Sequence, residues 1–302
     1  MMRKSARARR KGIIMFSFLL PGLAYYLIFR YAPMWGTLIA FMDYNPFVGF
    51  GGSAWVGFKH FRTFFESLYF GRLITNTLLL SVYSIVFGFP LPIVFALMLN
   101  EVKSMRFRSL VQSISYFPHF ISTVIICGLI KVYLSPSSGF VNAIIVALGG
   151  EAINFLQEPG WFRTVYVASG IWQGMGWGSI IYYATLSSVD TTLYEAASID
   201  GAGRLAKVIH ISLPALIPTM TTLLLMNLGN ILNVGFEKVL LLYNSSTYST
   251  SDIISTYVYR MGITQMKYSF ASAVGLFNNV VGLVIIVFFN YLARKVGETS
   301  LW

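Results

Sequence analysis

The chain has 302 residues, of which 56% are hydrophobic and only 11% are charged, and its mean hydropathy is +0.68. Soluble domains usually contain about 25% charged residues, so this composition is that of a membrane protein. The formal net charge of +11 does not indicate nucleic-acid binding, because the basic residues lie between long apolar runs and not on one polar surface.

The first apolar segment, residues 13–31, follows a tail of residues 1–12 that contains six lysines and arginines. A basic start before an apolar run resembles a secretory signal peptide. No small-residue cleavage site closes the run, so we expect an uncleaved membrane anchor.

Six segments of the chain reach the length of about 20 apolar residues that a membrane-spanning helix needs. Lipid offers the backbone no hydrogen bonds, so each segment must be a helix, and we expect an all-α polytopic membrane protein. Gly88, Pro90 and Pro92 should kink the second segment. The six predicted spans are residues 13–31, 74–99, 110–134, 164–188, 216–236 and 270–293.

The distribution of basic residues predicts the orientation. Six spans place both chain ends on one side, and the segments on that side contain more than half of the 22 lysines and arginines. The outside segments, residues 32–73, 135–163 and 237–269, are much longer in total but hold fewer. The positive-inside rule therefore predicts a multi-pass protein of the cell membrane with both termini in the cytoplasm.

The fourth loop, residues 190–214, has the pattern of a helix–turn–helix at the cytoplasmic face. Thr192 followed by Glu195 predicts a capping box at the start of a helix. Asp200 and Gly201 form a turn signal, and Pro214 marks the entry to the fifth span. The small residues of this loop leave a smooth face that another protein could approach. A capped surface loop without a partner is the alternative.

The same loop resembles the EAA motif of ABC-importer permeases. In that motif Glu-Ala-Ala is followed by Gly after three residues and by Ile-x-Leu-Pro after nine more. The residues in register here are Glu195, Ala196, Ala197, Asp200, Gly201, Ala202, Ile211, Leu213 and Pro214. Residues 31–61, 116–120 and 172–183 are similar to sugar permeases of the maltose-system class, most of all its polysaccharide or complex-oligosaccharide group. One departure is Thr191, where many relatives have proline.

The resemblance implies the type I ABC importer permease fold, with residues 1–302 as one transmembrane permease domain. It implies a second permease subunit, usually a similar chain in a heterodimer, two cytoplasmic ATPase subunits, and an extracytoplasmic solute-binding protein that delivers an oligosaccharide. The chain has no phosphate-binding Gly-x4-Gly-Lys-Ser/Thr loop. We therefore expect a transport subunit that is not an enzyme and holds no cofactor, with ATP and Mg bound by its partners.

The EAA loop would be the coupling helix that docks on an ATPase. Glu195 is the first candidate for an ion pair with the ATPase, and Gly201 for the turn that aims the helix. Arg204 and Lys207 are weaker candidates, because their charge also fits the positive-inside pattern. The predicted coupling residues are Glu195, Ala196, Ala197, Asp200, Gly201, Ala202, Arg204, Leu213 and Pro214.

Polar residues inside the spans predict a substrate path, because such residues usually face the bundle interior or a watery cavity. Asn227, Asn230 and Asn233 recur every three residues in the fifth span and should share a helical face. Amides and aromatic rings suit a neutral, hydroxyl-rich ligand. The alternative is that these amides join helices by hydrogen bonds. The remaining candidates are Trp172, Gln173, Asn278 and Asn279.

Other functions find less support in the sequence. His60, His119 and His210 lie on different sides of the membrane in this topology, so we expect no metal site. An ABC-importer permease for another solute, such as a peptide or an amino acid, stays an alternative. A stand-alone secondary transporter should show buried acidic residues or histidines in its spans and inverted repeats, and neither is found.

Overall fold

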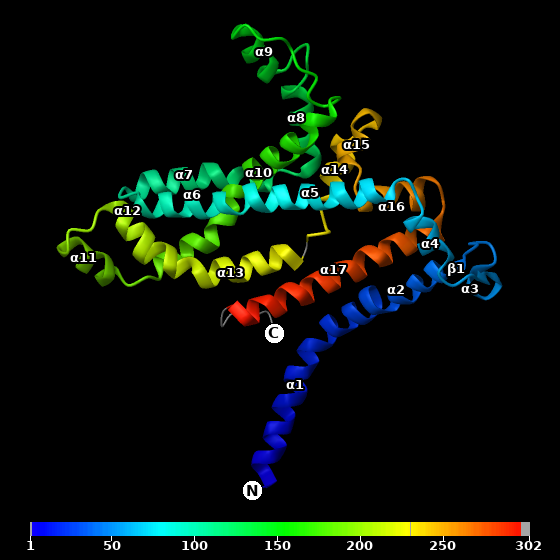
Figure 1. Ribbon diagram of the computed structural model, residues 1–302. Coiled ribbons are helices and arrows are strands. Elements are labelled where there is room, and N and C mark those ends of the chain that lie inside the picture. The colour runs from blue at the N-terminus through cyan, green and yellow to red at the C-terminus, as the bar shows by residue number, and fades with distance from the viewer. Residues whose placement is uncertain (1, 230, 297–302) are drawn as a thin grey trace. The chain divides into compact units, whose positions relative to one another are not determined.

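The computed structural model describes residues 2–229 and 231–296, and the chain divides into two compact units (Figure 1). The first unit comprises Met1–Glu66 and Val258–Phe277, and the second comprises Ser67–Tyr257 and Asn278–Trp302. Two helices, α16 (Ile254–Tyr259) and α17 (Tyr268–Val296), contribute residues to both units.

The first unit begins with a long helical stretch and continues into a short hairpin. Its further elements are α1 (Met2–Tyr26), π-helix η1 (Leu27–Tyr31), α2 (Ala32–Met34), 3-10 helix η2 (Trp35–Phe41), β1 (Met42–Asp43), α3 (Gly49–Gly52), β2 (Ala54–Trp55), α4 (Lys59–Phe65) and π-helix η6 (Arg260–Thr264). Strands β1 and β2 pair antiparallel, with Met42 opposite Trp55. Asp43 in β1 accepts a 2.7 Å hydrogen bond from the Lys59 ammonium, which lowers the pKa of Asp43.

The second unit contains most of the predicted spans. Its further elements are α5 (Phe70–Gly88), α6 (Pro90–Glu101), α7 (Met105–Tyr116), 3-10 helix η3 (Phe117–Phe120), α8 (Thr123–Tyr133), α9 (Phe140–Ala147), α10 (Pro159–Ser187), α11 (Thr191–Ile199), α12 (Arg204–Lys207), π-helix η4 (Val208–Ser212), α13 (Leu213–Gly229), α14 (Phe236–Leu242), 3-10 helix η5 (Ser245–Thr247) and α15 (Tyr248–Ser251).

Four described helical stretches are long and apolar enough to cross a membrane: Met15–Phe41, Phe70–Glu101, Arg204–Gly229 and Tyr268–Leu292. A fifth arises if Met105–Phe120 and Thr123–Tyr133, which are bent by 98° to each other, form one span. The predicted span 164–188 coincides with α10, whose 29 residues are long enough. Helix α10 is less apolar than the others because it carries several glycines, serines and tyrosines.

The predicted span 110–134 is therefore not one straight helix in the structure. The buried Pro118 has no N–H to continue the helical hydrogen bonds. After it the chain leaves the helix at Ile121, and Ser122 caps a new helix by accepting the Ile125 N–H at 3.4 Å. By contrast, α5 and α6 follow nearly one line past Pro90 (Figure 1), so the second span stays a single stretch.

Helix α10 is the centre of the second unit and packs against α5, α6, α7, α13 and α15. Between α6, α10 and α13 the core is formed by Ala96, Tyr182 and Leu216, all buried. A Cβ at Gly176 would lie 2.1 Å from the carbonyl oxygen of Ser115, so α7 approaches α10 where the side chain is absent. Close approach at small residues is the usual basis of helix packing in membranes.

Candidate functional site

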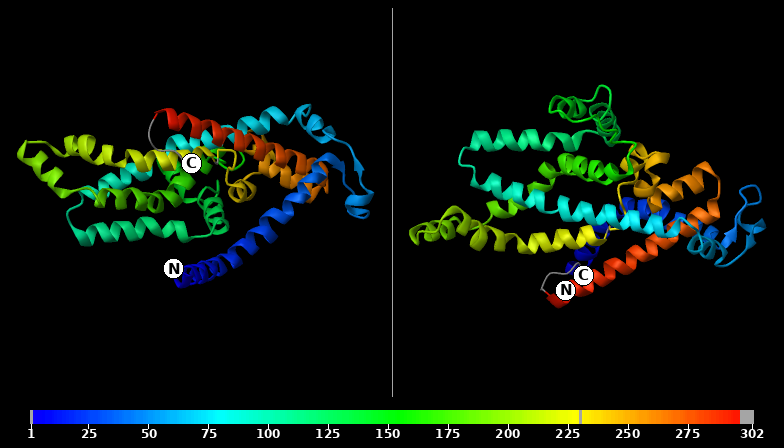
Figure 2. Two further views of the ribbon diagram at one scale, coloured as in Figure 1. Left: turned by 90° about the horizontal axis from the view of Figure 1, so that it is seen from below. Right: turned by 45° about the horizontal axis from the view of Figure 1, so that its top comes forward.

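The loop between α10 and α13 forms a small helical hairpin at one end of the second unit. Figures 1 and 2 show α11 and α12 at the end where α6 turns into α7, away from α14 and α15. The predicted second helix starts at Arg204, as expected. It then continues through η4 into α13 with Leu213 and Pro214 in its first turn, so the loop and that span form one continuous helical stretch.

The predicted capping box at the start of α11 is wrong. The N-cap is Asp190, whose carboxylate accepts the Thr192 N–H at 2.9 Å, and Thr192 is the second residue of the helix. Hydrogen bonds from Thr192 lower the pKa of Asp190. An aspartate two residues earlier competes successfully because a carboxylate is a strong acceptor near the positive end of a helix. Glu195 is therefore not part of the cap, and within the described residues its exposed side chain makes no hydrogen bond or ion pair.

Helix α11 ends in a Schellman motif centred on Gly201. The Gly201 N–H donates to Ser198 O at 3.1 Å, and the Ala202 N–H donates to Ala197 O at 2.8 Å. Gly201 has a φ of +77°, which favours glycine, as the turn signal predicted. A Cβ at Gly201 would meet nothing within 4 Å, so only the backbone conformation restricts this position.

Two side-chain hydrogen bonds brace the hairpin. The Tyr194 hydroxyl lies 2.9 Å from Oγ of Ser212, a buried residue of η4. The Lys207 ammonium donates to Ser198 Oγ at 2.5 Å. Helix α11 is thus attached to the start of α13 and not only linked to it by the chain, which makes the hairpin a stiff extension of that helix.

Apolar side chains of the hairpin are uncovered. Ile199 is 87% exposed and Leu205 71% exposed, and Leu193 is also exposed. Glu195 and Arg204 are exposed beside them. An apolar surface with charged neighbours on a loop between membrane helices is typical of a docking surface for another protein.

A cavity of about 500 Å³ lies in the second unit between α5, α6, α10, α13 and α14. Of the predicted substrate-path residues, Gln173 and Asn227 line it. Gln173 Nε2 also donates to Ile121 O at 3.3 Å, and Asn227 Nδ2 donates to Leu223 O at 2.8 Å. The cavity wall includes Tyr166 and Tyr182, so it offers both amides and aromatic rings.

The other candidates are not brought to this cavity. Trp172 is on α10 but exposed, and Asn279 is exposed on α17. Asn278 Oδ1 is buried and has no hydrogen-bond partner among the described residues. The shared helical face predicted for the fifth span is wrong, because α13 ends at Gly229 and Asn233 lies in the irregular segment after it. Asn230 lies outside the described residues.

Sequence reasoning missed Lys238, on α14, which also lines the cavity. Its side chain is buried, whereas its place in residues 237–269 predicts one more basic residue outside the membrane. The signal was available in part, since Lys238 precedes the apolar run Val239 to Leu242 and is a cation in a largely apolar environment.

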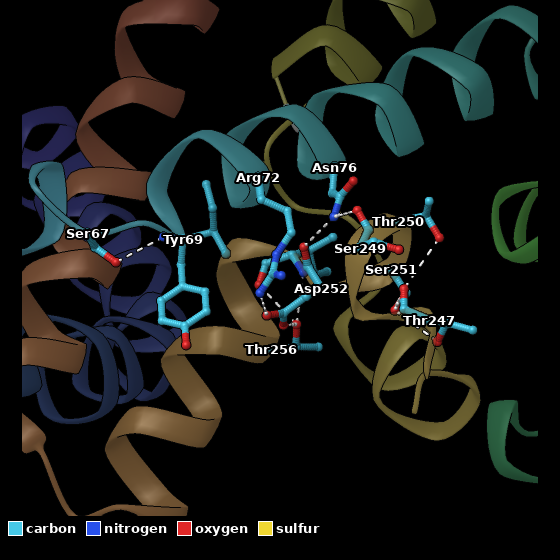
Figure 3. Close-up of polar contacts among 12 residues, drawn as sticks. Ser67, Tyr69, Arg72, Asn76, Thr247, Ser249, Thr250, Ser251, Asp252 and Thr256 are labelled. Atoms are coloured by element: carbon cyan, nitrogen blue, oxygen red, sulfur yellow. Dashed lines mark hydrogen bonds and ion pairs between the residues drawn. The ribbon is translucent and has the colours of Figure 1, made fainter. Parts of the chain in front are cut away.

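A buried polar network holds the segment that follows α14 against α5 (Figure 3). Asn76 Nδ2 donates to Ser249 O and to Asp252 O, both at 3.1 Å, and Asn76 Oδ1 accepts from Arg163 at 2.9 Å. Arg72 lies 3.8 Å from the fully buried Asp252 carboxylate. Loss of one partner from such a network leaves a buried charge uncompensated, so the network fixes this segment firmly.

The three histidines have separate local surroundings. His119 stacks on Trp177 with ring centroids 4.5 Å apart, His60 lies 3.1 Å from Asp43, and His210 Nδ1 lies 2.9 Å from Ala206 O. Among the described residues, no group of three His, Cys, Asp or Glu side chains could hold a metal ion.

Residues 88–298 match the family of binding-protein-dependent transport system inner membrane components, and the chain belongs to that family. It is thus a permease subunit of a binding-protein-dependent importer and an inner-membrane protein. The all-α permease fold predicted from the sequence, and the family inferred from the EAA loop, are confirmed.

Three relatives show how closely the chain follows known members. It is 47% identical to Protein LplB of Bacillus subtilis (strain 168), over 94% of this chain and 89% of that protein. It is 46% identical to the polygalacturonan/rhamnogalacturonan transport system permease protein YteP of the same organism, over 94% of this chain and 88% of that one. A chain of a bacterial ABC transporter involved in the import of the acidic polysaccharide alginate superposes with a TM-score of 0.90 at 45% identity, covering 98% of this chain and 100% of that chain.

Proposed function

We propose that this chain is one of two permease subunits of an ATP-driven importer that moves oligosaccharides into the cytoplasm by alternating access. Support comes from the relatives, since one is described as transporting polygalacturonan or rhamnogalacturonan and another takes part in alginate import. The cavity in the second unit supports it as well, because its amides and tyrosine rings suit hydroxyl-rich ligands.

The single observation that carries the coupling mechanism is the braced hairpin of α11 and α12. Glu195, Ile199 and Leu205 are exposed on it and would dock in a groove of an ATPase subunit, with Glu195 paired to a basic residue there. When ATP brings the two ATPases together, the hairpin would move with its ATPase as a rigid lever. Because the hairpin continues into α13, that span would tilt and open the cavity to the other side.

The proposed orientation, with both termini in the cytoplasm, is supported by the basic residues near the same surface. The hairpin lies at the end where α6 turns into α7, and that turn and the start of α7 carry Lys103, Arg106 and Arg108. Basic residues of both loops then face the cytoplasm, as do both termini. The partners are a second permease, two ATPases that bind ATP and Mg, and an extracytoplasmic binding protein. The alginate transporter has been crystallised with an alginate pentasaccharide-bound periplasmic protein. This chain needs no cofactor of its own.

The test is purification followed by transport. The tagged chain should co-purify with a second permease and an ATPase. The assembled complex in proteoliposomes should take up labelled oligosaccharide only when ATP and the binding protein are both present. Uptake by the chain alone would contradict the proposal, and uptake of peptides or amino acids in place of sugars would favour the alternative solute.

The orientation can be tested with a single engineered cysteine. Leu205→Cys is placed on an exposed position, in a Cys127→Ser background that removes the chain's own cysteine. A membrane-impermeant maleimide should label it in inside-out vesicles stripped of the ATPase, which would otherwise cover this position, and not in intact cells. Labelling from the outside of intact cells would overturn the orientation.

A further inference from the structure

The cavity contains one charged side chain. Of the described residues that line it, Lys238 alone carries a charge at neutral pH. The rest of the wall consists of apolar side chains, glycines, tyrosines, a serine, and the amides of Gln173 and Asn227. No aspartate or glutamate belongs to this lining, so the cavity is electrostatically positive.

The position of the Lys238 ammonium is well defined. Nζ donates to Tyr166 O at 3.0 Å and lies 5.0 Å from the centroid of the Tyr166 ring. The Tyr166 hydroxyl in turn accepts the Gly235 N–H at 3.1 Å, which ties α10 to the start of α14. A Cβ at Gly170 would lie 3.4 Å from Nζ, so this glycine leaves space beside the ammonium. Among the described residues, the three ammonium protons have one hydrogen-bond acceptor.

The ammonium also lacks a counter-ion. The ion pairs found among the described residues are elsewhere, and none involves Lys238. The titratable groups beside it are Cys127 on α8 and Tyr166 on α10, and the exposed Glu237 precedes it on its own helix. Burial lowers the pKa of Lys238 to about 8, so the ammonium is still mostly charged at neutral pH. It would attract a negative group that entered the cavity. The open side from which such a group can come is the cavity.

We propose that Lys238 binds a carboxylate of an acidic oligosaccharide inside the cavity and thereby selects sugars that contain uronic acids over neutral ones. This inference rests on the proposed function and adds the substrate class and the residue that recognises it. The carboxylate would complete the donor set of the ammonium, because charge-assisted hydrogen bonds are the strong ones. Gln173 and Asn227 would contact the hydroxyl groups of the same sugar.

The experiment measures uptake by the assembled complex in proteoliposomes. Two labelled probes are used: trigalacturonate, and the same trisaccharide after its carboxyl groups have been reduced to alcohols. The variants are Lys238→Gln, Lys238→Arg and, as a matched control, Lys131→Gln, which removes a lysine of α8 that does not line this cavity. ATP hydrolysis stimulated by the binding protein reports whether each variant assembles.

We expect Lys238→Gln to lower uptake of trigalacturonate by about tenfold or more, because hydrogen bonds between charged groups are the strong ones. Lys238→Arg should retain most of it, uptake of the reduced trisaccharide should not change, and Lys131→Gln should match the wild type. If the wild type takes up only the acidic probe, the proposal is tested by trigalacturonate uptake alone. That uptake should be retained in Lys238→Arg and lost in Lys238→Gln.

Three outcomes would overturn the assignment, because Lys238 would then act through packing or not at all. They are an equal loss of uptake of both probes in Lys238→Gln, a loss of trigalacturonate uptake in Lys238→Arg as well, and no loss of uptake in either variant. Wild-type uptake of the neutral probe alone would overturn this inference and leave the proposed function standing. Uptake of neither probe would overturn this inference, and the proposed function falls with it only if other oligosaccharides are not taken up either.

Discussion

The turn at Gly201 allows a quantitative test of coupling. Its φ of +77° lies in the left-handed region, where a residue with a side chain costs about 1–2 kcal/mol and a β-branched one is least tolerated. A Cβ there would meet no atom within 4 Å, so Gly201→Val adds backbone strain without a steric clash. A cost of this size lowers the population of the correctly aimed hairpin by about 5- to 30-fold relative to competing conformations.

The assay is ATP hydrolysis by the reconstituted complex, with and without the loaded binding protein. Gly201→Val should reduce the stimulation and the uptake by about the same factor, about 5- to 30-fold, while basal hydrolysis is unchanged. The loss of stimulation and of uptake in Gly201→Asn should be smaller than in Gly201→Val but still measurable, because asparagine tolerates the left-handed conformation better than valine.

Gly203→Ser is the control in the same turn, because Gly203 is the N-cap of α12 and serine is a preferred N-cap residue. Gly203 has a φ of −70° and a ψ of 170°, and a Cβ there also meets nothing within 4 Å. It should change coupling by no more than about twofold, since surface substitutions usually stay within 0.5 kcal/mol. Full stimulation in Gly201→Val, or an equal loss in the control, would refute the role of the positive φ.

Three further predictions concern the same fold. Asp190→Ala should remove about 1 kcal/mol of cap stabilisation from α11 and lower stimulated ATP hydrolysis several-fold. Thr192→Ala should have a smaller effect. A larger loss in Thr192→Ala than in Asp190→Ala would indicate that Thr192 is the cap. Tyr194→Phe deletes the hydrogen bond to Ser212 in η4, which contributes about 1 kcal/mol. It should raise the number of ATP molecules consumed per sugar imported without changing complex assembly. An unchanged number of ATP molecules per sugar would show that this hydrogen bond does not stiffen the hairpin. Gly176→Ala should destabilise the packing of α7 on α10 by about 1–3 kcal/mol and lower the thermal unfolding midpoint of the purified complex, whereas Gly160→Ala, where a Cβ meets nothing within 4 Å, should leave the midpoint nearly unchanged.

Features that depend on a short stretch of chain could be predicted from the sequence. The apolar segments had to be helices because lipid leaves the backbone no other hydrogen-bond partners. The EAA pattern identified the hairpin and its family, and the glycine at position 201 indicated the left-handed turn that the Schellman motif contains. Local prediction failed in two places. Asp190 took the cap that Thr192 was expected to supply, and the chain leaves the helix after Pro118 inside the predicted span 110–134.

Features that depend on residues far apart in the chain were decided only by the tertiary structure. Periodicity in the fifth span gave a face of three asparagines, but α13 ends at Gly229, so Asn233 has left that face. Lys238 appeared to be one more basic residue outside the membrane, and only the packing of α14 against Tyr166 on α10 places it in the cavity with Gln173. Sequence patterns fix which stretches become helices, because helix formation is local. The side chains that meet in a common cavity are fixed by how helices from distant parts of the chain pack.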